Sequence, residues 1–453
     1  MKGSRLAARV LLLLTAAWAL FAFAGIYRWT VAPLALCVAV LAIVVPPRIA
    51  RAGTRLTDFA LVAAVAAIAI QLIPLPFGLR SAIAPSSIAY EQVARVGAGV
   101  APSAGPITVN RDATAFALFI TVVILVFFWC ARTALRRGGV RTTIRGIAIM
   151  GAIVAPLALL QHASAPHQYY FRWRSHVGNA LVFTPFINRN DFASWLIMAL
   201  PLTGGYAVAR IQSRRRTGKP FDPESALDDK GLVLGAALVM MLAGLLASMS
   251  RSGVTGAAAA LLLFVVLARG RMSGQWIAWM LAGTAAMIVV AALYASNLGA
   301  LTARFSGVVS EGLTGRLAIW RQTWPMVEKF WPVGSGVGSY QEVMVFYQTT
   351  TSRLFYISHA DNEFLQILAE GGLLVGIPVA LAIVGVVRTI ALRLHADRTP
   401  LFWIRAGAAC GILAAGVQNL FEMTLRVPAN AILLALLTAI ASHDGGSDTR
   451  RQV

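Results

Sequence analysis

The chain has 453 residues, of which 58% are hydrophobic and only 13% are charged, with a mean hydropathy of +0.72. Soluble domains carry about 45–50% apolar and about 25% charged residues, so the composition excludes an ordinary soluble enzyme, a disordered chain and a secreted disulfide scaffold. The net charge of +21 would suggest a nucleic-acid partner in a soluble protein. Inner-membrane proteins, however, collect arginine in their cytoplasmic loops, and we therefore expect no nucleic acid.

Twelve apolar segments recur along the chain, and each is close to the roughly 20 residues that a helix needs to cross a bilayer. The first could pass for a signal peptide, but a second follows almost at once, which favours an uncleaved helix. The sequence therefore predicts an all-α polytopic membrane protein with about twelve transmembrane helices. The segments lie near residues 9–26, 30–46, 57–73, 113–131, 143–161, 191–209, 231–248, 253–268, 275–295, 363–387, 401–420 and 427–442.

The basic residues predict the orientation of these helices. With the N-terminus in the cytoplasm, 25 of the 39 Lys and Arg residues fall in cytoplasmic segments. This positive-inside bias predicts a multi-pass protein of the bacterial inner membrane with both termini cytoplasmic. We expect a nine-helix membrane region with short periplasmic loops over residues 1–295, a long periplasmic loop over residues 296–361, and a three-helix region with a cytoplasmic tail over residues 362–453. The long loop exceeds the length of a simple connection, which favours a function.

Several ionisable or amide residues lie on the predicted periplasmic side, beside the ends of spans, where charge is costly and usually functional. Asn188, Arg189 and Asn190 precede the sixth span. These residues form an amide-and-guanidinium pocket for a polar headgroup, or, as the alternative, Asn190 or Asp191 caps the helix and Arg189 reaches the membrane interface. Arg251 lies in a very short turn and Arg316 begins a predicted periplasmic helix. Either arginine suits a bidentate contact with phosphate, although snorkelling or a cation–π contact with a tryptophan is the structural alternative.

The segment that opens the tenth span carries the candidate base. Ser358 and Asp361 have the spacing of a capping box, which would place His359 in the first helical turn, where the positive helix terminus favours a neutral imidazole. Glu363, Gln366 and Glu370 continue a polar stripe at helical spacing. A loop rich in glycine follows Pro332, but it lacks the strand context of a dinucleotide site and predicts a tight connection.

Glu422 and Arg426 are four residues apart at the end of the eleventh span, which is the spacing of an intrahelical pair, and such a pair is either part of the site or only a structural clamp. All of these features fall on the same predicted face of the membrane. Arginines with one histidine need no metal, and the three cysteines have no metal or disulfide spacing. We therefore expect a phosphate-bearing lipid as the substrate, with no metal and no cofactor.

The order and spacing of these motifs resemble the O-antigen ligase and polymerase superfamily of bacterial polysaccharide assembly over most of the length. The elements are QLIPLP at 71–76, NRN at 188–190, SRSG at 250–253, GRLAIW at 315–320, GSGVGSY at 334–340, HADNEFLQ at 359–366 and LRVPAN at 425–430. Many relatives carry a second histidine where this chain has Asp361, and a His and an Asp in the element that here reads QNLFE at 418–422. Glu422 can stand for that Asp, but the His is absent.

The resemblance implies a GT-C-type membrane glycosyltransferase that takes a glycan from undecaprenyl diphosphate, without a metal. It implies that Arg251 and Arg316 bind the diphosphate and that His359 assists the acceptor hydroxyl. The expected substrate-binding residues are Asn188, Arg189, Asn190, Asn362, Glu370 and Arg426.

The resemblance leaves the acceptor open. Lipid A–core would indicate a ligase of lipopolysaccharide synthesis, a growing polysaccharide would indicate a polymerase, and a protein hydroxyl would indicate a protein O-oligosaccharyltransferase. A transporter or flippase is the alternative from another class, but we see neither the internal repeats nor the midplane charges that it predicts. A sensor or scaffold would not require the set of Arg251, Arg316 and His359.

Overall fold

The computed structural model describes residues 2–51, 53–94, 104–175, 181–216, 229–305, 313–349 and 356–444, and every structural statement below refers to these. They form sixteen α-helices, two short 3₁₀-helices and one two-stranded hairpin. The all-helical fold class is therefore confirmed. The predicted cytoplasmic tail after residue 444 lies outside the described residues.

Each of the twelve predicted apolar segments overlaps one α-helix, with ends that differ by at most five residues where the segment extends beyond the helix. Six of these helices are long and apolar enough to cross a membrane, namely α6, α7, α8, α11, α15 and α16. The count of twelve spans and the GT-C type stay predictions. The twelve helices are α1 (Lys2–Phe21), α2 (Arg28–Val44), α3 (Arg55–Ile70), α6 (Arg111–Arg136), α7 (Val140–Ser164), α8 (Arg189–Arg216), α10 (Asp229–Ala247), α11 (Arg251–Ala268), α12 (Gly274–Phe305), α15 (Glu363–Ala396), α16 (Leu401–Gln418) and α17 (Pro428–Ser442).

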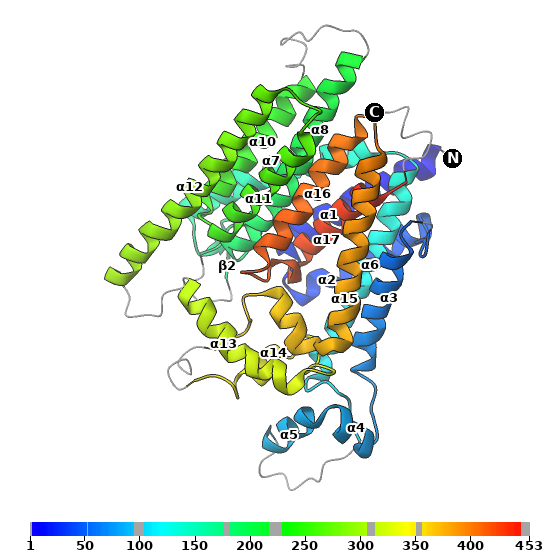
Figure 1. The fold of residues 1–453 in the computed structure, drawn as a ribbon, viewed down its shortest axis with the longest axis vertical. Helices are drawn as coiled ribbons and strands as arrows, with labels where there is room; N and C mark the ends of the chain where they lie inside the picture. Colours follow the sequence, from blue (N-terminus) through cyan, green and yellow to red (C-terminus); the bar gives the residue numbers. More distant parts are fainter. Residues whose placement is uncertain are drawn as a thin grey trace.

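The remaining elements lie between the apolar helices in the chain, and all of them except α13 are short. Figure 1 shows α4, α5, α13 and α14 gathered at one end of the bundle, while the start of α1 and the end of α17 lie toward the other end. These elements are η1 (Phe23–Gly25), α4 (Phe77–Ile83), α5 (Pro85–Ala94), β1 (Gln168–Tyr169), β2 (Trp173–Arg174), α13 (Leu313–Phe330), α14 (Tyr340–Met344) and η3 (Thr424–Arg426).

Close backbone contact between α8, α11 and α16 builds the centre of the bundle. A Cβ on Gly205 of α8 would lie 2.3 Å from the carbonyl oxygen of Trp403, and one on Gly407 of α16 would lie 2.2 Å from that of Pro201. Glycine at these positions lets the two backbones approach directly, as small residues do between membrane helices. The starts of α8 and α11 consequently meet the end of α16 at one end of the bundle.

The tenth predicted segment begins at residue 363, as α15 does, but the predicted cap at Ser358 is wrong by four residues. The helix begins at Glu363, and Asn362 caps it, because the Asn362 side chain accepts hydrogen bonds from the backbone N–H groups of Phe364 and Leu365, both at 3.1 Å. Asp361 has a left-handed φ of 48°, which breaks the helical path before the cap. His359 therefore lies in the extended segment that precedes the helix, and the capping box from Ser358 is not formed.

Candidate active site

The candidate residues come from five segments that meet at the end of the bundle where α13 lies (Figure 1). The segments are the starts of α8 and α11, helix α13, the stretch before α15, and residues 418–427 between α16 and α17. The last of these contacts most of the others. The indole of Trp320 on α13 stacks on Phe421 at 6.2 Å between ring centroids, and the backbone N–H of Glu363 donates to the carbonyl of Asn419 at 3.0 Å.

Glu422 is the centre of a buried polar network. Its Oε1 atom forms an ion pair with Arg316 and accepts hydrogen bonds from Asn190 Nδ2 at 2.8 Å and Ser252 Oγ at 3.2 Å. Ser250, which caps α11, donates from its hydroxyl to Asn190 Oδ1 at 2.8 Å. Glu422 is only 6% exposed, and this burial raises its pKa to about 7 although Arg316 acts in the opposite direction.

Three arginines concentrate positive charge beside this network. Arg189 and Arg316 lie close enough to Arg251 for their charges to repel its guanidinium. Each of the three is partly exposed, and within the described chain neither Arg189 nor Arg251 forms an ion pair with a carboxylate. Guanidinium groups suit bidentate contacts with phosphate oxygens. The cluster therefore has the charge and the donors to hold a diphosphate.

Asn188 starts α8 instead of binding in the network. Its side-chain oxygen accepts a hydrogen bond from the backbone N–H of Asn190 at 2.9 Å, and Arg189 is the first helical residue. Asn188 therefore caps the helix, and the predicted cap at Asn190 or Asp191 is wrong by two or three residues. Asn190 points its amide at Glu422 and Ser250, and its carbonyl accepts from Gln418 at 3.0 Å.

Arg426 belongs to a second network, and the expected intrahelical pair with Glu422 is wrong. Helix α16 ends at Gln418, so Glu422 and Arg426 do not share a helix. Arg426 instead contacts Glu370 at 2.7 Å and Glu363 at 3.3 Å. Glu370 is 1% exposed. It also accepts from the Gln366 amide at 3.0 Å and from the backbone N–H of Tyr340 at 3.2 Å.

His359 is exposed on the segment between the two networks, and its neighbour Ala360 is firmly held. The indole of Trp320 donates to the Ala360 carbonyl, and the Ala360 N–H donates to Gln366, each at 2.9 Å. The pKa of His359 lies below its ordinary value, because the surrounding protein removes part of its hydration and the positive charge of Arg426 opposes protonation. Its neutral form is thus favoured by these neighbours and not by a place in the first helical turn.

Sequence reasoning missed several residues of the site. It left the role of Glu422 in doubt, and it assigned no role to Ser250, Ser252 or Tyr340. The sequence offers only a weak signal for these residues, because serine caps and loop tyrosines are common in proteins. Among the described residues, no cluster of three or more His, Cys, Asp or Glu is arranged to hold a metal ion.

Residues 236–380, about a third of the chain, match the family model described as O-antigen ligase. This segment of the chain is similar to the O-antigen ligase family. This confirms the resemblance and supports a function of the ligase or polymerase type, in a family of membrane glycosyltransferase-like proteins whose substrates are lipid-linked saccharides. The matched segment contains Arg251, Arg316, His359 and Glu370, whereas Glu422 lies outside it. No curated protein sequence matched the chain.

Proposed function

We propose that this protein transfers a glycan from undecaprenyl diphosphate to a hydroxyl group of a periplasmic acceptor. The observation that carries the proposal is the meeting of Arg189, Arg251 and Arg316 with the Glu422 network, close to Asp361 of the segment that carries His359. The similarity of residues 236–380 to the O-antigen ligase family supports a lipid-linked saccharide as the donor. The positive-inside bias supports an inner-membrane protein with cytoplasmic termini and this site on the periplasmic face.

The arginine cluster binds the donor diphosphate and stabilises it as the leaving group. In the transfer, the acceptor oxygen forms a bond to the anomeric carbon, and the bond from that carbon to the diphosphate oxygen breaks with its electron pair going to the diphosphate. Guanidinium groups that are already in place stabilise this charge as it develops. Arg316 has to exchange its contact with Glu422 for a phosphate oxygen, whereas Arg189 and Arg251 keep no carboxylate contact in the described structure.

His359 accepts the proton of the acceptor hydroxyl. A general base has to be unprotonated at the working pH, and the lowered pKa of His359 meets this condition. The residue is exposed at the protein surface, so an acceptor can approach it. Asn362 and the pair of Glu370 with Arg426 hold the segment that carries His359, through the helix cap and the second network.

The acceptor is proposed as lipid A–core, which makes the chain a ligase. A second lipid-linked glycan, for a polymerase, and a protein hydroxyl are the alternatives within the same chemistry. A transporter or flippase would place ionisable groups near the membrane midplane, whereas the arginines named here lie at or near helix starts.

The deciding experiment supplies purified protein in detergent with an undecaprenyl-diphosphate glycan and, separately, lipid A–core, a second lipid-linked glycan and a pilin peptide. We expect product with lipid A–core, and loss of product in Arg316→Ala. Arg321→Ala is the matched control, because Arg321 is an exposed residue of the same helix. Absence of product with every acceptor, or a wild-type rate in Arg316→Ala, would contradict the proposal.

A further inference from the structure

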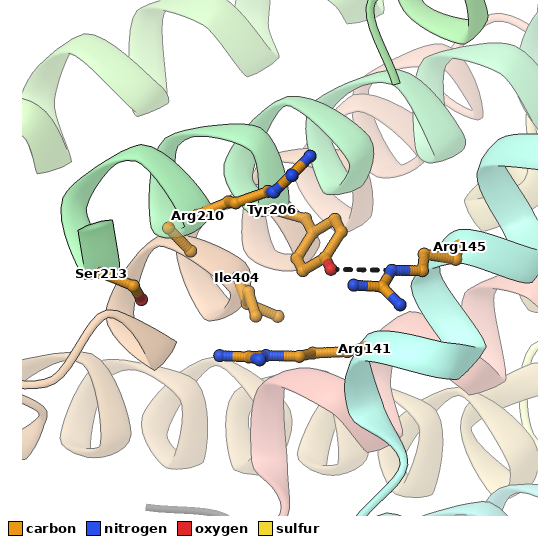
Figure 2. Close-up of a pocket in the computed structure, with 7 residues that line it drawn as sticks. Arg141, Arg145, Tyr206, Arg210, Ser213 and Ile404 are labelled. Carbon is orange, nitrogen blue, oxygen red and sulfur yellow. Dashed lines mark hydrogen bonds between the residues drawn. The ribbon is translucent and has the colours of Figure 1, made fainter. Parts of the chain in front are cut away.

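A second basic site lies between α7, α8 and α16, well away from the candidate active site. It is a cavity of about 180 Å³ lined by Arg141, Arg145, Tyr206, Ala209, Arg210, Ser213 and Ile404 (Figure 2). The lining residues of α7 are four apart, and those of α8 fall at positions 206, 209, 210 and 213, so each set shares one face of its helix. Among the described residues, no carboxylate lines the cavity.

The length of α8 separates this cavity from the candidate active site. Asn190 lies at the start of the helix and Arg210 lies 20 residues further along it. At a rise of about 1.5 Å per residue, this distance is about 30 Å, which is the thickness of the hydrocarbon core of a bilayer. The cavity is therefore at the opposite membrane surface, and the arginine-rich segments around it place that surface in the cytoplasm.

The side-chain contacts around the cavity leave some hydrogen-bond donors directed into it. Arg145 donates from Nε to the hydroxyl of Tyr206 at 2.9 Å, and Tyr206 is only 3% exposed. This contact fixes the plane of the guanidinium, and Figure 2 shows its other two nitrogens turned toward the space above Arg141. The hydroxyl oxygen of Ser213 is buried and has no hydrogen-bond partner in the described part of the chain. Buried polar groups without a partner are rare and require an explanation.

We propose that this cavity binds a phosphate group, supplied by the headgroup of an anionic phospholipid of the cytoplasmic leaflet. Two arginines one helical turn apart, a fixed guanidinium and an unpartnered hydroxyl are suited to the oxygens of a phosphate. A basic pocket between transmembrane helices at the cytoplasmic surface has the location that lipid headgroups reach. Free phosphate has the same chemistry, so the experiment has to separate the two sources.

The experiment measures binding to the full-length protein purified in a neutral detergent. The probes are short-chain phosphatidylglycerol, short-chain phosphatidylcholine and inorganic phosphate. We expect saturable binding of phosphatidylglycerol, with weaker binding of the other two. The double variant Arg141→Gln/Arg145→Gln should bind phosphatidylglycerol at least about tenfold more weakly, because it removes charge-assisted hydrogen bonds.

Two further variants keep the result interpretable. Arg388→Gln removes the same charge from an exposed position on α15 and should bind like the wild type. Ser213→Asp adds a negative charge to the cavity without removing an arginine and should also abolish binding, which decides the question if the double variant does not elute as a folded monodisperse protein. Binding of phosphate but not of the lipid would overturn the lipid source. Equal binding of phosphatidylglycerol by the wild type and Ser213→Asp would overturn the site. So would a wild type that binds neither phosphatidylglycerol nor phosphate.

Discussion

Donor binding is predicted to depend on pH through Glu422. In the structure, Glu422 holds Arg316 in an ion pair and also accepts from Asn190 and Ser252. A diphosphate that takes Arg316 removes the positive charge that favours the ionised carboxylate, and Asp361 already acts against that form. The pKa of Glu422 is about 7 without the donor and should therefore be higher in the complex.

The sign and size of the effect follow from proton linkage. Because the complex has the higher pKa, donor binding takes up a proton, and the affinity weakens as the pH rises above about 7. The donor affinity then falls by up to about tenfold per pH unit, which is about 1.4 kcal/mol of binding free energy. This fall continues until the pH reaches the pKa of Glu422 in the complex. Below pH 7, Glu422 is protonated with and without the donor, so its titration should no longer change the donor affinity. His359 is neutral throughout the upper range because its pKa lies below the ordinary value of 6.5.

The assay is the dissociation constant of the donor measured between pH 6 and pH 9 for wild type and Glu422→Gln. The wild type should weaken by about tenfold between pH 7 and pH 8.5. Glu422→Gln cannot ionise and should show no such slope. Glu328→Gln, at an exposed position of α13, is the matched control and should keep the wild-type profile. Equal slopes in wild type and Glu422→Gln would refute the competition between Glu422 and the donor for Arg316.

Four further predictions address the donor site, the base, the metal and the fold. Arg316→Lys keeps the charge but loses the planar fork, so donor affinity should fall by about tenfold or more; wild-type affinity would contradict bidentate binding. His359→Ala should lower turnover by about 10²–10⁴-fold with donor affinity unchanged, and full activity in His359→Gln would leave only a positioning role. Transfer should persist in EDTA, and loss restored by magnesium would refute a metal-free reaction. Gly334→Ala should lower the unfolding free energy by more than about 1 kcal/mol, measured by denaturation, because Gly334 has φ +75° and its added Cβ would lie 2.0 Å from the Glu370 carbonyl.

The sequence predicted the helices well because hydropathy decides where apolar helices form. It also found the residues that carry charge, since arginines and histidines on the wrong side of a positive-inside pattern stand out. The sequence did not predict correctly which residues contact one another. The spacing of Glu422 and Arg426 fits a helical pair, but each forms its ion pair with a residue distant in the chain. Likewise, Ser358 and Asn362 both fit a helix cap, and contacts of Ala360 with Trp320 and Gln366 accompany the later start.

A break in α15 gives the segment between α13 and α14 a place to dock. This docking positions parts of the site that are distant from one another in the chain. Gly372 lies in the helix with a non-helical φ of 56°, which interrupts the ladder of backbone hydrogen bonds. The segment after α13 enters the gap and replaces the lost bonds with four of its own. These are Leu373 N to Trp331 O (3.0 Å), Leu374 N to Pro332 O (3.2 Å), Ser335 N to Ala369 O (3.2 Å) and Gly336 N to Glu370 O (2.9 Å).

These backbone hydrogen bonds between α15 and the segment after α13 connect the two networks of the candidate site. The amide of Gln71, at the end of α3, reinforces it by donating to the carbonyls of Val333 at 2.7 Å and Glu370 at 3.0 Å. Glu370 is thus held by its carbonyl as well as by its side chain, which contacts Arg426. Helix α13 leads directly into the docked segment, so the same contact sets the place of Arg316 relative to Glu422. The geometry of the arginine cluster therefore depends on a helix break more than 50 residues away from Arg316 in sequence, which no local motif could have indicated.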